Sequence, residues 1–136
     1  MLSFIALALA TNVAPCPGAS TAQANACFDA RLNKSERILN RYFQVALKRA
    51  RKDSGGKTAK GLIQAERSWV AYRDAECASV FDYWRGGTIR VAMERDCRIR
   101  LNRLRTYAIW SDWLTYPDST PPLLPRPDVK SITSER

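Results

Sequence analysis

The chain has 136 residues, a length that suits one domain and is too short for two well-buried ones. Its hydrophobic share of 46% is ordinary for a globular protein, which excludes a wholly disordered chain and a membrane bundle. Lys and Arg number 22 against 13 Asp and Glu, and the net charge of +9 lies entirely between Asp29 and Tyr116. We expect that stretch to attract polyanions.

The first ten residues form an uncharged apolar run that is followed by small residues and by Pro15. Such a run is typical of a signal peptide, and Ala8-Leu9-Ala10 supplies a small-x-small pattern for cleavage after Ala10. An N-terminal core helix is less favoured, because no residue caps it and proline-rich sequence follows. A transmembrane helix would need about 20 apolar residues. The sequence therefore predicts export, with a signal peptide and arm over residues 1–15.

An amphipathic stretch follows over residues 21–52, with Ser20 and Gln23 in the relation of a capping box. Its apolar or small positions recur in steps of three and four, as on one face of a helix: Phe28, Leu32, Ser35, Leu39, Tyr42, Ala46 and Ala50. Basic residues recur at helical spacing on the other side: Lys34, Arg37, Arg41, Lys48 and Lys52. These five residues, named here the basic stripe, are either a solvated face or a candidate anion-binding site.

Residues 53–56 contain two glycines and break this pattern, and Thr58 is expected to cap a second helix. Gly86-Gly87 is expected to end that helix, and Thr88 to cap a third. The second helix has a core face with Leu62, Ala65, Trp69, Tyr72, Cys77, Val80, Phe81 and Trp84. The third has one with Ile89, Met93, Cys97, Leu101, Leu104 and Ala108. We therefore predict an all-α fold, a small bundle of three long helices with a hairpin turning at Gly86-Gly87.

Four cysteines in a small exported domain predict two disulfides, for which three pairings are possible. In a hairpin that turns at Gly86-Gly87, Cys77 and Cys97 lie at nearly the same height, about 14 Å from the turn. We expect these two to pair, which leaves Cys16 and Cys27 to tie the N-terminal arm to the first helix. Zinc is not expected, because the chain has no His and no Cys-x-x-Cys.

Residues 117–136 are rich in proline, serine and threonine, a composition that cannot form a packed helix. We predict a mobile or extended tail that acts as a linker or a loose arm.

The most distinctive segment is residues 64–77, Gln-Ala-Glu-Arg-Ser-Trp-Val-Ala-Tyr-Arg-Asp-Ala-Glu-Cys, which precedes Gly86-Gly87-Thr88-Ile89 and Cys97. It resembles the LprI-like family, formerly a domain of unknown function, whose members share a Trp-x-x-aromatic-Arg-Asp-x-Glu-Cys run, a Gly-Gly-Ser/Thr-Ile turn and a later Cys. The resemblance covers the predicted helical domain, residues 16–116, nearly to its end. It implies a secreted or periplasmic helical domain without cofactor or enzyme activity, and lysozyme inhibition is proposed for the member that gives the family its name.

The motif residues are expected to build a polar cluster that specifies the fold. On a helix, Glu66, Trp69, Arg73 and Cys77 share one face, where Arg73 can hold a carboxylate or terminal carbonyls bidentately. The other structural positions in the motif and turn are Tyr72, Asp74, Glu76, Gly86 and Gly87. Asp74 and Glu76 are suited to acid-base chemistry, but no nucleophile or metal ligand accompanies them, so no enzyme activity, cofactor or metal is expected.

Two functions are compatible with these features. The first is an inhibitor that occupies the cleft of a lysozyme-type enzyme. Because animal lysozymes are basic, a partner of +9 would be repelled at long range, and inhibition would need a local acidic patch or a lysozyme of opposite charge. The second is a cell-envelope binding module whose basic helices dock on anionic glycan, lipid head groups or an acidic protein.

Nucleotides and nucleic acids are weaker candidates. Residues 54–58, Ser-Gly-Gly-Lys-Thr, end like a phosphate-binding loop, but the upstream glycine of that motif is missing and a helix precedes it. An arginine run could meet phosphates: Arg95, Arg98, Arg100, Arg103 and Arg105. These side chains scatter around the predicted helix and export removes the usual substrate, so no nucleic-acid partner is expected.

Overall fold

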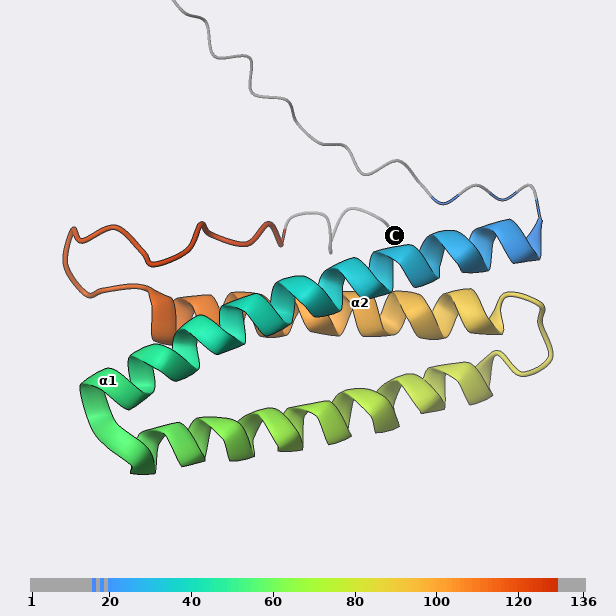
Figure 1. Ribbon diagram of the computed structural model, residues 1–136. Helices are drawn as coiled ribbons and strands as arrows, with labels where there is room; N and C mark the ends of the chain where they lie inside the picture. The colour runs from blue at the N-terminus through green and yellow to red at the C-terminus, as the bar shows by residue number, and fades with distance from the viewer. Residues whose placement is uncertain (1–15, 17, 19, 130–136) are drawn as a thin grey trace, which may run out of the picture.

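The computed structural model describes residues 16, 18 and 20–129 (Figure 1). Their secondary structure consists of helix α1, Thr21–Tyr83, helix α2, Arg90–Ile109, and the π-helical turn η1, Trp110–Leu114, which continues α2. The predicted all-α class is confirmed. The predicted signal peptide falls on residues 1–15, which lie outside the described part of the chain.

The prediction of three separate helices is wrong, because α1 runs through the expected break as one bent helix. The bend lies at Gly55, whose φ of 74° and ψ of −165° are not helical. A positive φ costs glycine little, because it has no Cβ atom. Thr58 therefore lies inside α1 and caps no second helix. Two arms result, the first arm (residues 21–54) and the second arm (residues 56–83), and both lie beside α2 (Figure 1).

The ends of the helices agree only in part with the predicted caps. Ser20 caps α1 as expected, because its Oγ accepts a hydrogen bond from the backbone N–H of Gln23 at 3.2 Å. α1 ends at Tyr83, before the two glycines, and α2 begins at Arg90 with Ile89 as a cap that makes no side-chain hydrogen bond. The prediction that Thr88 caps this helix is therefore wrong. Gly86 and Gly87 do lie in the short connection between α1 and α2, as the predicted hairpin requires.

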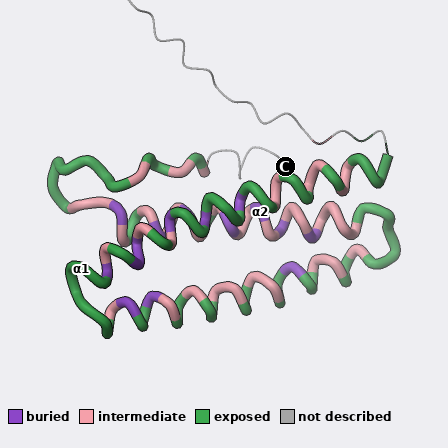
Figure 2. The backbone as a smooth tube through the Cα atoms, viewed as in Figure 1, coloured by how far each residue is buried: buried purple, intermediate pink, exposed green. Residues whose placement is uncertain are grey.

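The apolar core lies in the half of the bundle nearest the Gly55 bend (Figure 2). It is built from buried residues of both arms, of α2 and of η1: Leu39, Tyr42, Ala46, Leu47, Ala50, Ala59, Leu62, Ile109 and Leu114. The predicted core positions of the first arm from Ser35 to Ala50 are buried, whereas Phe28 and Leu32 are only partly so. Burying this face is what holds the first arm against its neighbours.

The buried face of α2 differs from the apolar face that we predicted. The structure buries Glu94, Asn102 and Thr106 of this helix, whereas Leu104 is 48% exposed. Because α2 packs against both arms of α1, the buried part of its circumference is wider than a single apolar stripe. Polar side chains within this part stay buried because they find hydrogen-bond partners, which are described below.

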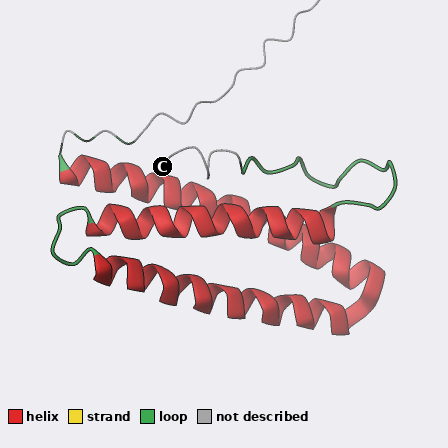
Figure 3. Ribbon diagram, turned by 180° about the vertical axis from the view of Figure 1, so that it is seen from behind, coloured by secondary structure: helices red, strands yellow, loops and turns green. Residues whose placement is uncertain are grey.

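The proline-rich segment is extended as far as residue 129 (Figure 3). It turns back after η1, and the backbone N–H of Leu123 donates to the carbonyl of Leu114 at 2.9 Å. Trp110 Nε1 donates to the carbonyl of Leu124 at 2.9 Å, and Tyr42 Oη donates to the carbonyl of Pro125 at 2.6 Å. Side chains of the core therefore attach this segment to the bundle.

Tyr42→Phe is expected to loosen the docked segment. The substitution removes the hydroxyl that donates to Pro125 and leaves that carbonyl without this partner, which should lower the free energy of unfolding by about 1 kcal/mol. Faster amide hydrogen exchange in residues 118–129 would report the loosening. Tyr72→Phe is the matched control, because Tyr72 is 55% exposed. Unchanged exchange in Tyr42→Phe would show that this hydrogen bond does not hold the segment.

Candidate functional site

Two disulfides have the pairing that the hairpin geometry predicts. Cys77–Cys97 joins the second arm to α2 with a Cα–Cα distance of 5.6 Å, and both residues are almost fully buried. Cys16–Cys27, with a Cα–Cα distance of 5.7 Å, fastens Cys16, which precedes the Ser20 cap of α1, to the second turn of that helix. The first disulfide therefore holds the hairpin together, and the second holds the N-terminal segment.

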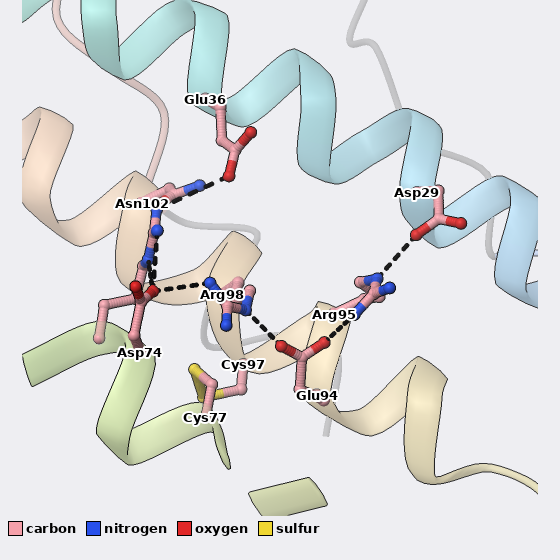
Figure 4. Close-up of polar contacts among 10 residues, drawn as sticks. Asp29, Glu36, Asp74, Cys77, Glu94, Arg95, Cys97, Arg98 and Asn102 are labelled. Atoms are coloured by element: carbon pink, nitrogen blue, oxygen red, sulfur yellow. Dashed lines mark hydrogen bonds and ion pairs between the residues drawn. A yellow bond between two sulfur atoms is a disulfide. The ribbon is translucent and has the colours of Figure 1, made fainter. Parts of the chain in front are cut away.

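A chain of ion pairs connects all three helical segments (Figure 4). Arg95 Nε donates to Asp29 Oδ1 of the first arm at 2.7 Å, and Arg95 also pairs with Glu94. Glu94, with its side chain only 8% exposed, pairs through its other oxygen with Arg98. Arg98 Nη1 then reaches Asp74 Oδ1 of the second arm at 2.7 Å. The buried Glu94 carboxylate is thus held between two guanidinium groups, as a buried charge requires.

Arg73 continues this network toward the centre of the bundle. Its Nη2 and Nε both donate to Asp74 Oδ1, at 2.9 and 3.1 Å, so it holds one carboxylate oxygen and not the two that a bidentate pair would use. Its Nη1 donates to Asn102 Oδ1 at 3.1 Å and lies 3.7 Å from Glu36 Oε1. Asn102, which is fully buried, donates in turn to Ser35 Oγ at 2.9 Å. Both amide atoms of Asn102 are therefore satisfied.

Trp69 lies between two arginines on the predicted motif face. The guanidinium carbons of Arg73 and Arg105 lie 5.4 and 5.9 Å from its ring centroid, and Arg105 Nε donates to Glu66 Oε2 at 2.9 Å. The structure thus brings Glu66, Trp69 and Arg73 together, as the helical spacing predicts. Trp69, which we placed on the core face of the predicted second helix, is only partly buried. Two other motif residues, Tyr72 and Glu76, are exposed and take no part in the network.

Sequence reasoning missed most partners of this network. The sequence did not single out the acidic and polar partners in this network, which are Asp29, Glu36, Glu94 and Asn102. A signal for Asn102 did exist, because asparagine is a poor helix former inside a helix unless its side chain has a partner. The arginines of α2 were considered only as phosphate contacts. Four of them form ion pairs within the chain instead: Arg95, Arg98, Arg100 and Arg105.

The electrostatics of Asp74 do not suit acid-base catalysis near neutral pH. Burial opposes ionisation of this carboxyl, but hydrogen bonds and charges from Arg73 and Arg98 outweigh that effect and lower its pKa below the usual 3.8. Asp74 therefore stays ionised well into the acidic range. Its folded pKa lies below the unfolded value, so its contribution to stability is complete above about pH 4 and is lost as the pH falls further.

The basic stripe, Lys34, Arg37, Arg41, Lys48 and Lys52, lies on the first arm. All five side chains are exposed, and none forms an ion pair with a residue in the described part of the chain. Between Lys34 and Lys52 the only acidic residue is Glu36, which pairs with Arg73, and Asp53, next to Lys52, pairs with Arg49. The positive charge of the stripe is therefore uncompensated locally.

A shallow, mainly apolar depression of about 320 Å³ lies between the two arms, and it is lined by Phe43, Ile63, Glu66, Arg67 and Val70. The described residues contain no group of three or more His, Cys, Asp or Glu side chains placed to hold a metal ion. Over the same residues, no helix combines the length and the apolar character needed to cross a membrane.

The fold and the network define a class, a small disulfide-bonded helical domain with an internally paired polar cluster and a basic outer face. The sequence model of the family described as lysozyme inhibitor LprI matches residues 16–109, more than half of the chain. The chain therefore belongs to the LprI family. No curated protein and no solved structure matches it.

Proposed function

We propose that this chain is an exported, non-enzymatic binding protein that inhibits a lysozyme-type enzyme in the periplasm or outside the cell. The observation that carries the proposal is the match to the lysozyme inhibitor family, which includes the whole disulfide-bonded part of the chain. Two disulfides favour an oxidising compartment. A signal peptide over residues 1–15 would deliver the chain there.

The arrangement of charged groups supports binding and not catalysis. The carboxylates of the network face arginines of the same chain, and the lowered pKa of Asp74 makes it a weak proton acceptor. A hydrolytic site would instead need a base near its operating pH and a nucleophile within hydrogen-bond reach. The network is better suited to keeping three helical segments in a fixed arrangement for a partner.

The test is a lysis assay with the oxidised domain that begins at Cys16. At micromolar concentration it is expected to slow cell-wall lysis by at least one of several lysozyme types. A reduced and alkylated sample is the control, because it should lose the disulfide-held shape and with it the inhibition. Lysis that proceeds unchanged with every lysozyme type would show that the proposal is wrong.

A second candidate function, docking on an anionic envelope component, is favoured by the uncompensated basic stripe. Lys34 and Lys52 at its ends lie about 27 Å apart along the helix, at about 1.5 Å per residue. Binding to vesicles rich in anionic lipid should fall steeply from low to moderate ionic strength.

Charge reversal separates a local effect of the stripe from an effect of net charge. Reversing Lys34, Arg41 and Lys48 to glutamate should abolish vesicle binding without changing lysozyme inhibition. The matched control reverses three exposed cations of the second arm: Lys57, Lys60 and Arg67. Equal losses in both triple variants would mean that net charge, and not the stripe, is responsible.

A further inference from the structure

The hairpin tip, residues 83–89, lies at the end of the bundle opposite the Gly55 bend (Figure 1), and most of its residues are exposed (Figure 2). Tyr83 is 81% exposed, the highest value among the large hydrophobic side chains described, and Ile89 is 47% exposed. Arg85 is exposed beside them. Tyrosine and arginine are enriched among the residues that dominate binding energy at protein interfaces. The tip therefore has the composition of a contact surface.

The tip is held in one shape before any partner arrives. The buried Cys77–Cys97 disulfide joins its two helices about 9 Å below Tyr83, at about 1.5 Å per residue. The guanidinium carbon of Arg90 lies 3.7 Å from the ring centroid of Phe81, just beneath the turn. Backbone hydrogen bonds close the turn itself, including Gly87 N to the Trp84 carbonyl at 2.9 Å. A preorganised surface loses little conformational entropy on binding.

The shape of the tip suits a concave partner. Gly86 and Gly87 carry no side chains, and no other atom lies within 4 Å of where a Cβ of Gly86 would stand. The turn is therefore uncovered at its apex, and the exposed side chain of Tyr83 stands at the end of the helix that leads into it. The depression between the two arms is itself hollow, so it does not fit into a cleft.

We propose that the hairpin tip is the inhibitory surface and that it enters the glycan-binding cleft of a lysozyme-type glycosidase, with Arg85 directed at the paired carboxylates of that cleft. This proposal rests on the function proposed above and names the surface that performs it. Glycosidases of this kind place two carboxyl groups on either side of the scissile bond. The cleft is thus a local acidic patch even on an enzyme whose net charge is positive.

The charge of the chain favours the tip over the basic stripe for this role. Charges on two solvent-exposed surfaces are screened beyond about 8 Å at physiological ionic strength, so the contact depends on nearby groups. The stripe would bring five cations against a basic enzyme, and like charges across an interface cost several kcal/mol. Arg85 would bring one cation to a carboxylate pair.

The test compares the full oxidised chain with tip variants against a lysozyme that the unmodified chain inhibits. Tyr83→Ala and Arg85→Glu are each expected to raise the inhibitor concentration for half-maximal effect at least about tenfold, which corresponds to about 1.4 kcal/mol. The controls, Tyr72→Ala and Arg51→Glu, alter exposed residues away from the tip and should change it less than about twofold. The exposure of Tyr83 and Arg85 means that both tip variants should fold, which helix content and thermal unfolding will verify.

A second readout is competition. A chito-oligosaccharide that fills the cleft should displace the unmodified chain from the enzyme, and inhibition should weaken as the concentration of a soluble glycan substrate rises. If the unmodified chain inhibits but the tip variants inhibit equally well, or if the oligosaccharide does not compete, the tip proposal is wrong and the inhibitor function stands. If the unmodified chain inhibits no lysozyme, both proposals fail.

Discussion

Replacing Cys77 and Cys97 together by alanine is expected to lower the free energy of unfolding by about 3 kcal/mol. The disulfide closes a loop between residues separated by 20 positions and joins the second arm to α2. Without it, the unfolded chain gains conformational freedom that the native state does not. Urea denaturation of the oxidised variant and the parent chain measures the difference directly, and the thermal midpoint should fall by at least about 10 °C.

Replacing Cys16 and Cys27 by alanine is the matched control, and its effect should be smaller. This disulfide closes a loop of 11 positions, and it ties the segment before α1 to an exposed end of the first arm. That segment can detach while the core remains packed, so the native state also gains freedom. A loss of stability equal to or greater than that of the Cys77/Cys97 variant would contradict the expectation that Cys77–Cys97 stabilises the fold more than Cys16–Cys27 does.

Arg73→Met is expected to lower the free energy of unfolding by about 2 to 3 kcal/mol, which is less than the cost of breaking a fully buried pair because Asp74 is half exposed. Methionine can still pack beside Trp69, but it donates no hydrogen bond. Asn102 Oδ1 is fully buried and would lose the partner that Arg73 supplies. Leaving such an acceptor unsatisfied accounts for much of the loss. Denaturant unfolding at pH 7 measures it.

A substitution of the same kind at an exposed position controls for the loss of charge. Arg67→Met on the same arm should change the free energy of unfolding by less than about 0.5 kcal/mol. The dependence of the free energy of unfolding on pH below about pH 4 gives an independent readout. Because Arg73 helps to lower the pKa of Asp74, the Arg73→Met variant should lose less stability than the parent between about pH 4 and pH 2. Identical stability of Arg73→Met and the parent at pH 7 would rule out a central role for this arginine.

Part of the candidate site could be predicted from the sequence because it depends on one helix. Glu66, Trp69, Arg73 and Cys77 lie at intervals of three or four residues, which places them on one face whatever packs against it. Their partners on other segments could not be predicted in this way. Arg105 and Asn102 belong to a different helix, and the contacts of both with this face follow only from how α2 is rotated against the second arm.

The sequence by itself determined the helical class, the Ser20 cap and the two disulfides, because these depend on local periodicity, on a side chain reaching its own backbone and on the length of a hairpin. Only the tertiary structure decided three other features. Gly55 bends one helix where we predicted a break, Glu94 and Asn102 are buried where we predicted an apolar face, and the proline-rich segment docks on Tyr42 and Trp110. The last two features depend on contacts between residues far apart in the chain, and periodicity along one helix says nothing about such contacts. A polar side chain is stable inside the bundle only where its partner arrives from another segment, and that is a property of the packed molecule.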